Sequence, residues 1–113
     1  MATKKMIKKL DKVFGAFIRS RKNCEWCAKD GNVVQLQWCH IFTRKCHNTR
    51  WSELNSLCLC SGCHRKAHDY PVLFTEWLKD YLGEEIYEEL KREHNRTKKW
   101  MDYELEELIE KYL

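Results

Sequence analysis

The chain has 113 residues, of which 43% are hydrophobic and 34% charged, and its net charge is +4. This balance is typical of a soluble globular protein, and the length fits a single domain over residues 1–113. No apolar run approaches the roughly 20 residues that cross a bilayer, and the first ten residues lack the apolar core of a signal peptide. We therefore expect a cytoplasmic protein with no membrane partner.

The first half of the chain predicts a helix followed by a strand, a loop, a second strand and another helix. Apolar residues recur at helical spacing over residues 4–20, with lysines on the opposite face. Residues 33–41 alternate apolar and polar side chains, as in a half-buried strand. Residues 42–55 show no clear period and indicate a loop. A short strand at residues 57–59 then leads into a helix that we expect just after Cys63.

The second half of the chain predicts helices only. Pro71 suits the first turn of a helix, where its missing N–H costs nothing, and Gly83 ends that helix. Further amphipathic stretches follow around residues 86–90 and 100–112. We expect the segment 71–113 to pack on the centre of the domain, and a coiled-coil or dimerising tail is the alternative. Together the elements predict an α+β fold.

Four of the seven cysteines form two Cys-x-x-Cys pairs, Cys24 with Cys27 and Cys60 with Cys63. An odd number of cysteines without a secretory signal indicates a reducing compartment, where thiolates bind metal. Two such pairs supply the four ligands of a closed tetrahedral site. The spacing therefore predicts one structural Zn²⁺, which would stabilise a domain with a small core. Redox-active or disulfide-bonded cysteines are the alternative.

The charges are unevenly distributed along the chain. Residues 1–50 contain 12 Lys or Arg and 3 Asp or Glu, a net +9, whereas residues 51–113 contain 9 and 14, a net −5. The basic half suits electrostatic docking to a nucleic acid, with the acidic helices turned away from the phosphates. Solvated helix faces with no partner would give the same pattern.

The histidines concentrate in the middle of the chain, where four of the five lie between residues 40 and 68. His64 and His68 have the i, i+4 spacing that places two imidazoles on one face of a helix, as a pair of metal ligands requires. Cys63 precedes His64 by about 100° of helical turn. One helix start could therefore serve the structural zinc and a second ion, although surface helices also carry such histidine pairs by chance.

These residues together resemble the HNH endonuclease family. His40 ends a predicted strand, Asn55 follows 15 positions later and His64 another nine, and all three fall among the two Cys-x-x-Cys pairs. The resemblance covers about residues 24–68 and implies a ββα-metal core, also called a His-Me finger. More loosely, residues 74–100 are similar to the tail of phage HNH proteins of the NinG recombination type.

The resemblance implies a metal-dependent DNA endonuclease or nickase. His40 would be the general base that activates water, and Asn55 would pin the loop between the strands and so fix the angle of His40. His64 and His68 would hold one catalytic divalent cation, which stabilises the phosphoanion and the leaving 3′ oxygen. The products would carry 5′-phosphate and 3′-hydroxyl ends.

Cys39 departs from the family pattern. The residue before the base histidine is commonly an Asp or His metal ligand in HNH proteins, and here it is a cysteine. A thiolate is a poor ligand for Mg²⁺, so Cys39 either binds a softer ion such as Zn²⁺, Mn²⁺ or Ni²⁺, or does not bind metal. In the second case it is a small buried strand residue.

Three cations lie in the predicted loop beside the active centre, namely Arg44, Lys45 and Arg50. We expect them to contact DNA phosphates, because an active-site loop must approach a polyanion. Solvated loop charges are the alternative.

Two other functions fit the same sequence. A non-catalytic zinc-stabilised module could present basic loops to nucleic acid, in which case the histidine pattern has no catalytic meaning. A structure-selective nuclease could instead cut branched DNA beside phage recombination or packaging proteins. The sequence is compatible with a monomer or a homodimer.

Overall fold

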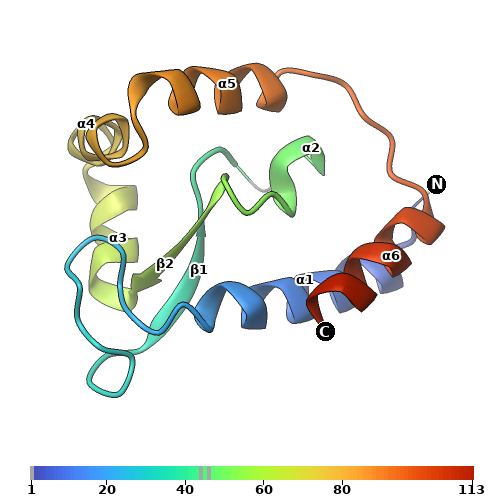
Figure 1. The fold of residues 1–113 in the computed structure, drawn as a ribbon, viewed down its shortest axis with the longest axis horizontal. Helices are drawn as coiled ribbons and strands as arrows, with labels where there is room; N and C mark the ends of the chain where they lie inside the picture. The colour runs from blue at the N-terminus through green and yellow to red at the C-terminus, as the bar shows by residue number, and fades with distance from the viewer. Residues whose placement is uncertain (1, 44, 46) are drawn as a thin grey trace.

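The computed structural model describes residues 2–43, 45 and 47–113, and it places a two-stranded antiparallel hairpin among helices (Figure 1). The strands are β1 (Leu36–His40) and β2 (Ser56–Cys60). Within the described residues there are six helices: α1 (Lys4–Arg19), α2 (His47–Arg50), α3 (Ser61–Asp69), α4 (Pro71–Leu82), α5 (Glu84–His94) and α6 (Asp102–Tyr112). The predicted α+β class is therefore confirmed.

The hairpin pairs Leu36 with Cys60 at one end and His40 with Ser56 at the other. β1 is shorter than the predicted strand at residues 33–41. The backbone N–H groups of Val33 and Val34 both donate to the carbonyl of Asp30, so this segment forms a turn and not a ladder. The consequence is that His40 is the last residue of the strand, at the edge of the loop that joins the two strands.

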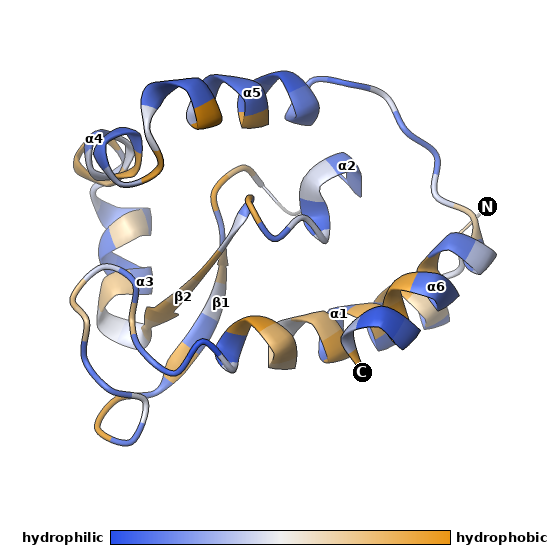
Figure 2. Cartoon of the chain, in the orientation of Figure 1, coloured by the Kyte–Doolittle hydropathy of each residue, from blue (hydrophilic) through white to orange (hydrophobic). Residues whose placement is uncertain are grey.

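Each face of the hairpin has its own apolar core, which explains why all five residues of β2 are buried. Leu57 and Leu59 point to one side, where they pack with residues of α3 and α4. Cys58 points to the other side, into a cluster formed mainly by α1 and α6. Figure 2 shows the apolar residues along β2 and α1, whereas much of α5 is hydrophilic.

The helix α1 packs closely on the hairpin through a glycine. A Cβ atom at Gly15 would lie 3.2 Å from the ring of Trp38, so a larger residue would require the ring to shift by a few tenths of an ångström. Phe14 packs beside it, with its ring centroid 5.1 Å from that of Trp38. The helix α6 lies along α1, as Figure 1 shows, so the C-terminal helix packs on the rest of the chain as expected.

Two local features differ from the sequence prediction. The segment expected to be a loop contains the short helix α2, whose Thr49 is buried. The helix α3 begins at Ser61, two residues before Cys63, because the Cys60 side chain acts as its N-cap and accepts a hydrogen bond from the backbone N–H of Cys63. Cys63 and His64 therefore both lie in the first turn of α3.

The helices are amphipathic, with one face in a core and one in water. In the 16-residue α1, Leu10, Phe14 and Ile18 are buried and the lysines are exposed. Among the described residues, no helix combines the length and the apolar character that crossing a membrane requires.

Candidate functional site

The four cysteines of the two Cys-x-x-Cys pairs come together in one cluster. The Sγ atoms of Cys24, Cys27, Cys60 and Cys63 all lie within 4.8 Å of one another, and those of Cys27 and Cys60 are 3.8 Å apart. A tetrahedron with Zn–S bonds of about 2.3 Å has edges of about 3.8 Å. The cluster therefore fits the donor set and the dimensions of a zinc site and could hold a structural metal.

The two cysteine pairs share the same local geometry. The backbone N–H of Cys27 donates to the sulfur of Cys24 at 3.5 Å, and that of Cys63 donates to the sulfur of Cys60 at 3.4 Å. Burial alone would raise the pKa of the Cys24 thiol, but backbone hydrogen bonds, that from Cys27 first, lower it to about 7. Burial raises the pKa of Cys63. The backbone thus favours a thiolate at Cys24, the form that binds metal.

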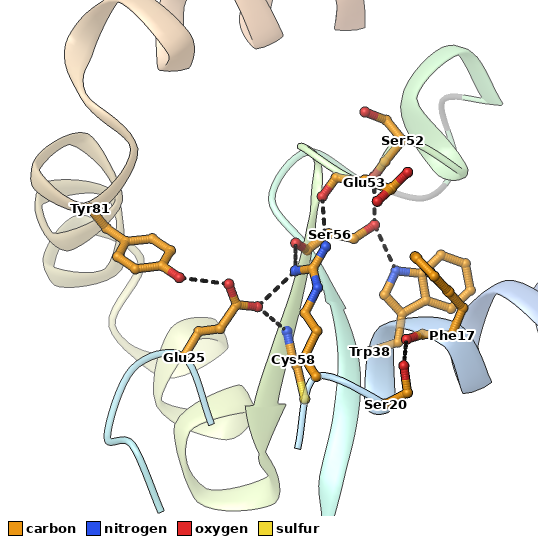
Figure 3. Close-up of polar contacts among 10 residues, drawn as sticks. Phe17, Ser20, Glu25, Trp38, Ser52, Glu53, Ser56, Cys58 and Tyr81 are labelled. Carbon is orange, nitrogen blue, oxygen red and sulfur yellow. Dashed lines mark hydrogen bonds and ion pairs between the residues drawn. The ribbon is translucent and has the colours of Figure 1, made fainter. Parts of the chain in front are cut away.

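A half-buried carboxylate connects the first cysteine pair to the rest of the fold. Glu25 accepts hydrogen bonds from the Arg21 guanidinium at 2.9 Å, the backbone N–H of Cys58 at 2.6 Å and the Tyr81 hydroxyl at 2.7 Å (Figure 3). Burial and the hydrogen bond to Glu25 raise the pKa of Tyr81 to about 12. Glu25 therefore connects the cysteine cluster to β2 and α4. The sequence carries no signal for this role of Glu25, because its partners are up to 56 positions away.

The predicted catalytic histidines line a pocket of about 570 Å³ that is separate from the cysteine cluster. Its lining includes His40 from β1 and His64 and His68 from α3, together with Cys39 and residues of α4, but none of the four clustered cysteines. The ring nitrogens of the three histidines are not all close enough to bind one ion. Among the described residues, the cysteine cluster is the one group of three or more potential ligands at metal-binding distance. The chain therefore has two chemically distinct candidate sites.

A backbone carbonyl holds the ring of His40. Its Nε2 lies 3.1 Å from the carbonyl oxygen of Arg50. A carbonyl only accepts hydrogen bonds, so Nε2 must carry the proton, and in a neutral ring Nδ1 then has the lone pair. The Trp38 ring, 4.2 Å away between centroids, packs against the imidazole. The tautomer and the orientation of His40 are thus both set by its neighbours.

Asn55 joins the two ends of the loop between the strands. Its side chain is fully buried, its Oδ1 accepts a hydrogen bond from the backbone N–H of Phe42 at 2.8 Å, and its Nδ2 donates to the carbonyls of Phe42 and Thr49. Its backbone carbonyl also accepts a hydrogen bond from Ile41. These bonds tie the residues after His40 to α2 and β2, so Asn55 lies where it can brace the loop around that histidine.

His64 and His68 lie side by side on α3, with ring centroids 5.1 Å apart. Nδ1 of His64 donates to the side-chain oxygen of Gln37 at 2.8 Å, which leaves Nε2 with the lone pair in the neutral ring. Burial and the neighbouring charge of His68 lower the pKa of His64, which favours that neutral, ligand-competent form. Gln37 orients His64 as an outer-shell partner orients a metal-binding histidine, and the sequence offered no signal for it.

Cys39 lies at the pocket but is almost inaccessible, with 3% of its surface exposed. Burial and the negative charge of Glu25 raise the pKa of its thiol to about 12. Its Sγ donates a weak hydrogen bond to the backbone carbonyl of His40 at 3.7 Å. The environment therefore favours the interpretation of Cys39 as a small buried strand residue.

The structure describes two of the three predicted phosphate-binding cations, Lys45 and Arg50. Arg44 lies outside the described residues, and Lys45 is exposed. The Arg50 guanidinium instead pairs with the carboxylate of Asp11 on α1, and its side chain is only 11% exposed. The contacts of Arg44 and Lys45 with phosphates stay predictions, and a contact from Arg50 would compete with its ion pair.

The comparisons with known proteins identify one family. The model of the family described as Bacteriophage Lambda NinG protein matches residues 2–113, which is nearly the whole chain. No curated protein and no solved structure matched the chain.

Proposed function

The chain belongs to the Bacteriophage Lambda NinG protein family, a family of phage proteins, and we propose from its candidate site that it is a metal-dependent DNA endonuclease or nickase with an HNH core. The observation that carries the proposal is the pocket lined by His40, His64 and His68, which is separate from the four-cysteine cluster. A module that only used zinc to hold its fold would need no second group of histidines. The order β1, loop, β2, α3 also supports a ββα-metal core.

In the proposed reaction, His40 is the general base. The neutral imidazole takes a proton on Nδ1 from a water molecule as the water oxygen attacks the phosphorus of the DNA backbone. A new P–O bond forms and the bond from phosphorus to the 3′ oxygen breaks. The leaving 3′ oxygen takes a proton from solvent water, so the strand ends carry a 5′-phosphate and a 3′-hydroxyl group. The hydrogen bond from Nε2 to the Arg50 carbonyl keeps the base in the required tautomer.

His64 and His68 would hold the catalytic cation. When bound, a divalent ion (Mg²⁺, Mn²⁺, Zn²⁺ or Ni²⁺) supplies positive charge that stabilises the phosphoanion and the leaving 3′ oxygen. The bond between Gln37 and Nδ1 of His64 directs the other ring nitrogen to this task. Cys39 does not belong to the proposed ligand set, because its side chain is buried and its Sγ is directed to the backbone carbonyl of His40. Asn55 would position the loop around the base.

The surface of α1 supports DNA as the partner. Five exposed lysines, at positions 4, 5, 8, 9 and 12, fall within an arc of about 140° at 100° per residue. None of the five forms an ion pair with a described carboxylate. The apolar face of α1 packs in the core, so its opposite face exposes a row of lysines to solvent without neutralising carboxylates. Such a row suits the regularly spaced phosphates of a duplex.

The experiment that tests the proposed function is cleavage of supercoiled plasmid DNA by the zinc-loaded protein. We expect nicking or cutting when Mg²⁺, Mn²⁺, Ni²⁺ or additional Zn²⁺ is present, and none when the second cation is withheld. The nicks should be sealed by DNA ligase without prior end repair, because ligase requires a 5′-phosphate beside a 3′-hydroxyl group.

Two results would count against the nuclease assignment. If the protein binds the plasmid but cuts it with none of the four cations, the non-catalytic zinc module becomes the better interpretation. If the nicks need a kinase or phosphatase before ligation, the direction of bond cleavage written above is wrong.

A further inference from the structure

The one acidic residue in the first 24 positions of the sequence is Asp11, and it lies on the lysine-rich helix α1. Its carboxylate faces the loop between the strands. Oδ1 accepts hydrogen bonds from Nε of Arg50 at 3.0 Å and from the indole N–H of Trp51 at 3.0 Å, and Oδ2 accepts from the second guanidinium nitrogen of Arg50. One carboxylate thus holds two consecutive side chains at the end of α2.

The same loop segment carries the carbonyl that orients His40. Nε2 of His40 donates to the backbone oxygen of Arg50, the residue whose guanidinium is clamped by Asp11. The following residue, Trp51, is 5% exposed and is held by Asp11 as well. The peptide unit between Arg50 and Trp51 contains that carbonyl, so it is fixed on both sides by a single carboxylate. A shift of this unit would move or remove the acceptor of the His40 proton.

We propose that Asp11 is a positioning residue for His40, acting through Arg50 and Trp51. This inference rests on the proposed function, since it concerns the residue assigned as the base. This role accounts for the carboxylate at position 11 of a helix whose other charged side chains are basic. The two N–H groups of the Arg50 guanidinium match the two oxygens of a carboxylate, and the indole N–H of Trp51 donates a further hydrogen bond to one of these oxygens.

The test uses Asp11→Asn in the full-length, zinc-loaded protein. The amide keeps the size of the side chain but loses the charge and one of the two acceptor oxygens. We expect the ¹⁵N resonances of the His40 ring to change from a single tautomer, protonated on Nε2, to a mixture of both. We expect kcat for plasmid nicking to fall by about 10- to 100-fold, the usual effect of losing an outer-shell partner or misplacing a reacting group.

A purely structural or electrostatic role would give different results. Loss of a negative charge beside the lysines of α1 should strengthen DNA binding or leave it unchanged, so the DNA concentration for half-maximal rate should not rise. Any loss of activity in Asp11→Asn should therefore appear as a lower kcat. The matched control is Glu104→Gln on α6, which weakens the ion pair with Lys98 and the bond to the backbone of Met101. It should lower the melting temperature without changing the His40 tautomer or kcat.

The inference is overturned if Asp11→Asn keeps a single His40 tautomer and the wild-type kcat while His40→Ala is inactive. If His40→Ala cuts as fast as the wild type, the proposed function fails, and the tautomer measurement still decides whether Asp11 orients the ring. If Asp11→Asn does not fold, Arg50→Lys tests the same contact from the other side. It should give the mixed tautomers and the lower kcat, and a single tautomer with unchanged kcat contradicts the proposal.

Discussion

Replacement of Cys27 by serine is expected to release the structural metal and to unfold the domain at temperatures where the wild type is folded. Cys27 is the exposed member of the cysteine cluster, so Cys27→Ser removes a ligand with little loss of packing. The free energy of binding a structural zinc ion is about 10–16 kcal/mol in small zinc-binding peptides. This exceeds the total stability of many domains of this size, so the folded state should depend on the metal.

The measurement is the zinc content of the purified protein together with its thermal unfolding. The matched control is Cys58→Ala, which removes a fully buried sulfur that is not part of the cluster. That variant should keep one equivalent of zinc and lose only about 0.5–3 kcal/mol, as most single substitutions do. If Cys27→Ser keeps the zinc content and the melting temperature of the wild type, the four-cysteine site does not stabilise this fold.

The second large effect is expected at the histidine pair of α3. His64→Ala and His68→Ala should each reduce single-turnover cleavage by about 100- to 1000-fold, the usual cost of removing a group that stabilises charge in the transition state. Both should also weaken binding of added Mn²⁺. Because the two rings line the pocket and not the cysteine cluster, the zinc content should stay unchanged.

The control for this pair is His47→Ala on α2, a histidine outside the lining of the pocket. It packs against Trp51, with a ring centroid separation of 5.8 Å, so its loss should affect stability more than the rate. If His64→Ala cleaves DNA at the wild-type rate, His64 does not bind the catalytic cation.

Local patterns in the sequence were enough for much of the fold. The helix α1 extends over Lys4–Arg19 as its apolar spacing predicted, and Pro71 and Gly83 bound α4. Gly83 has a φ of +88°, a conformation that glycine adopts without strain, so the helix ends there. Each cysteine pair was also predictable, because a Cys-x-x-Cys spacing places two sulfurs together, and the need for four ligands predicted that the two pairs meet.

The contacts that orient the candidate site could not be predicted in the same way. Asp11 and Arg50 are 39 positions apart, and Glu25 meets Cys58 across 33 positions. Such pairs arise from the packing of α1 and the first cysteine pair on the hairpin, and they leave no period in the sequence. For this reason Arg50 was expected to contact phosphate, whereas the structure pairs its guanidinium with a carboxylate and uses its carbonyl to hold His40.

The central claim is that His40 is the base of a DNA-cleaving site, and one assay tests it most directly. Zinc-loaded wild type, His40→Ala and His40→Gln are compared in single-turnover nicking of supercoiled plasmid with each of the four cations. His40→Gln keeps an N–H group that can donate to the Arg50 carbonyl but cannot take a proton from water. We predict nicking by the wild type and rates about 100- to 10,000-fold lower for both variants, at unchanged zinc content. Equal rates for the wild type and the variants, or no nicking by the wild type with any cation, would contradict this account.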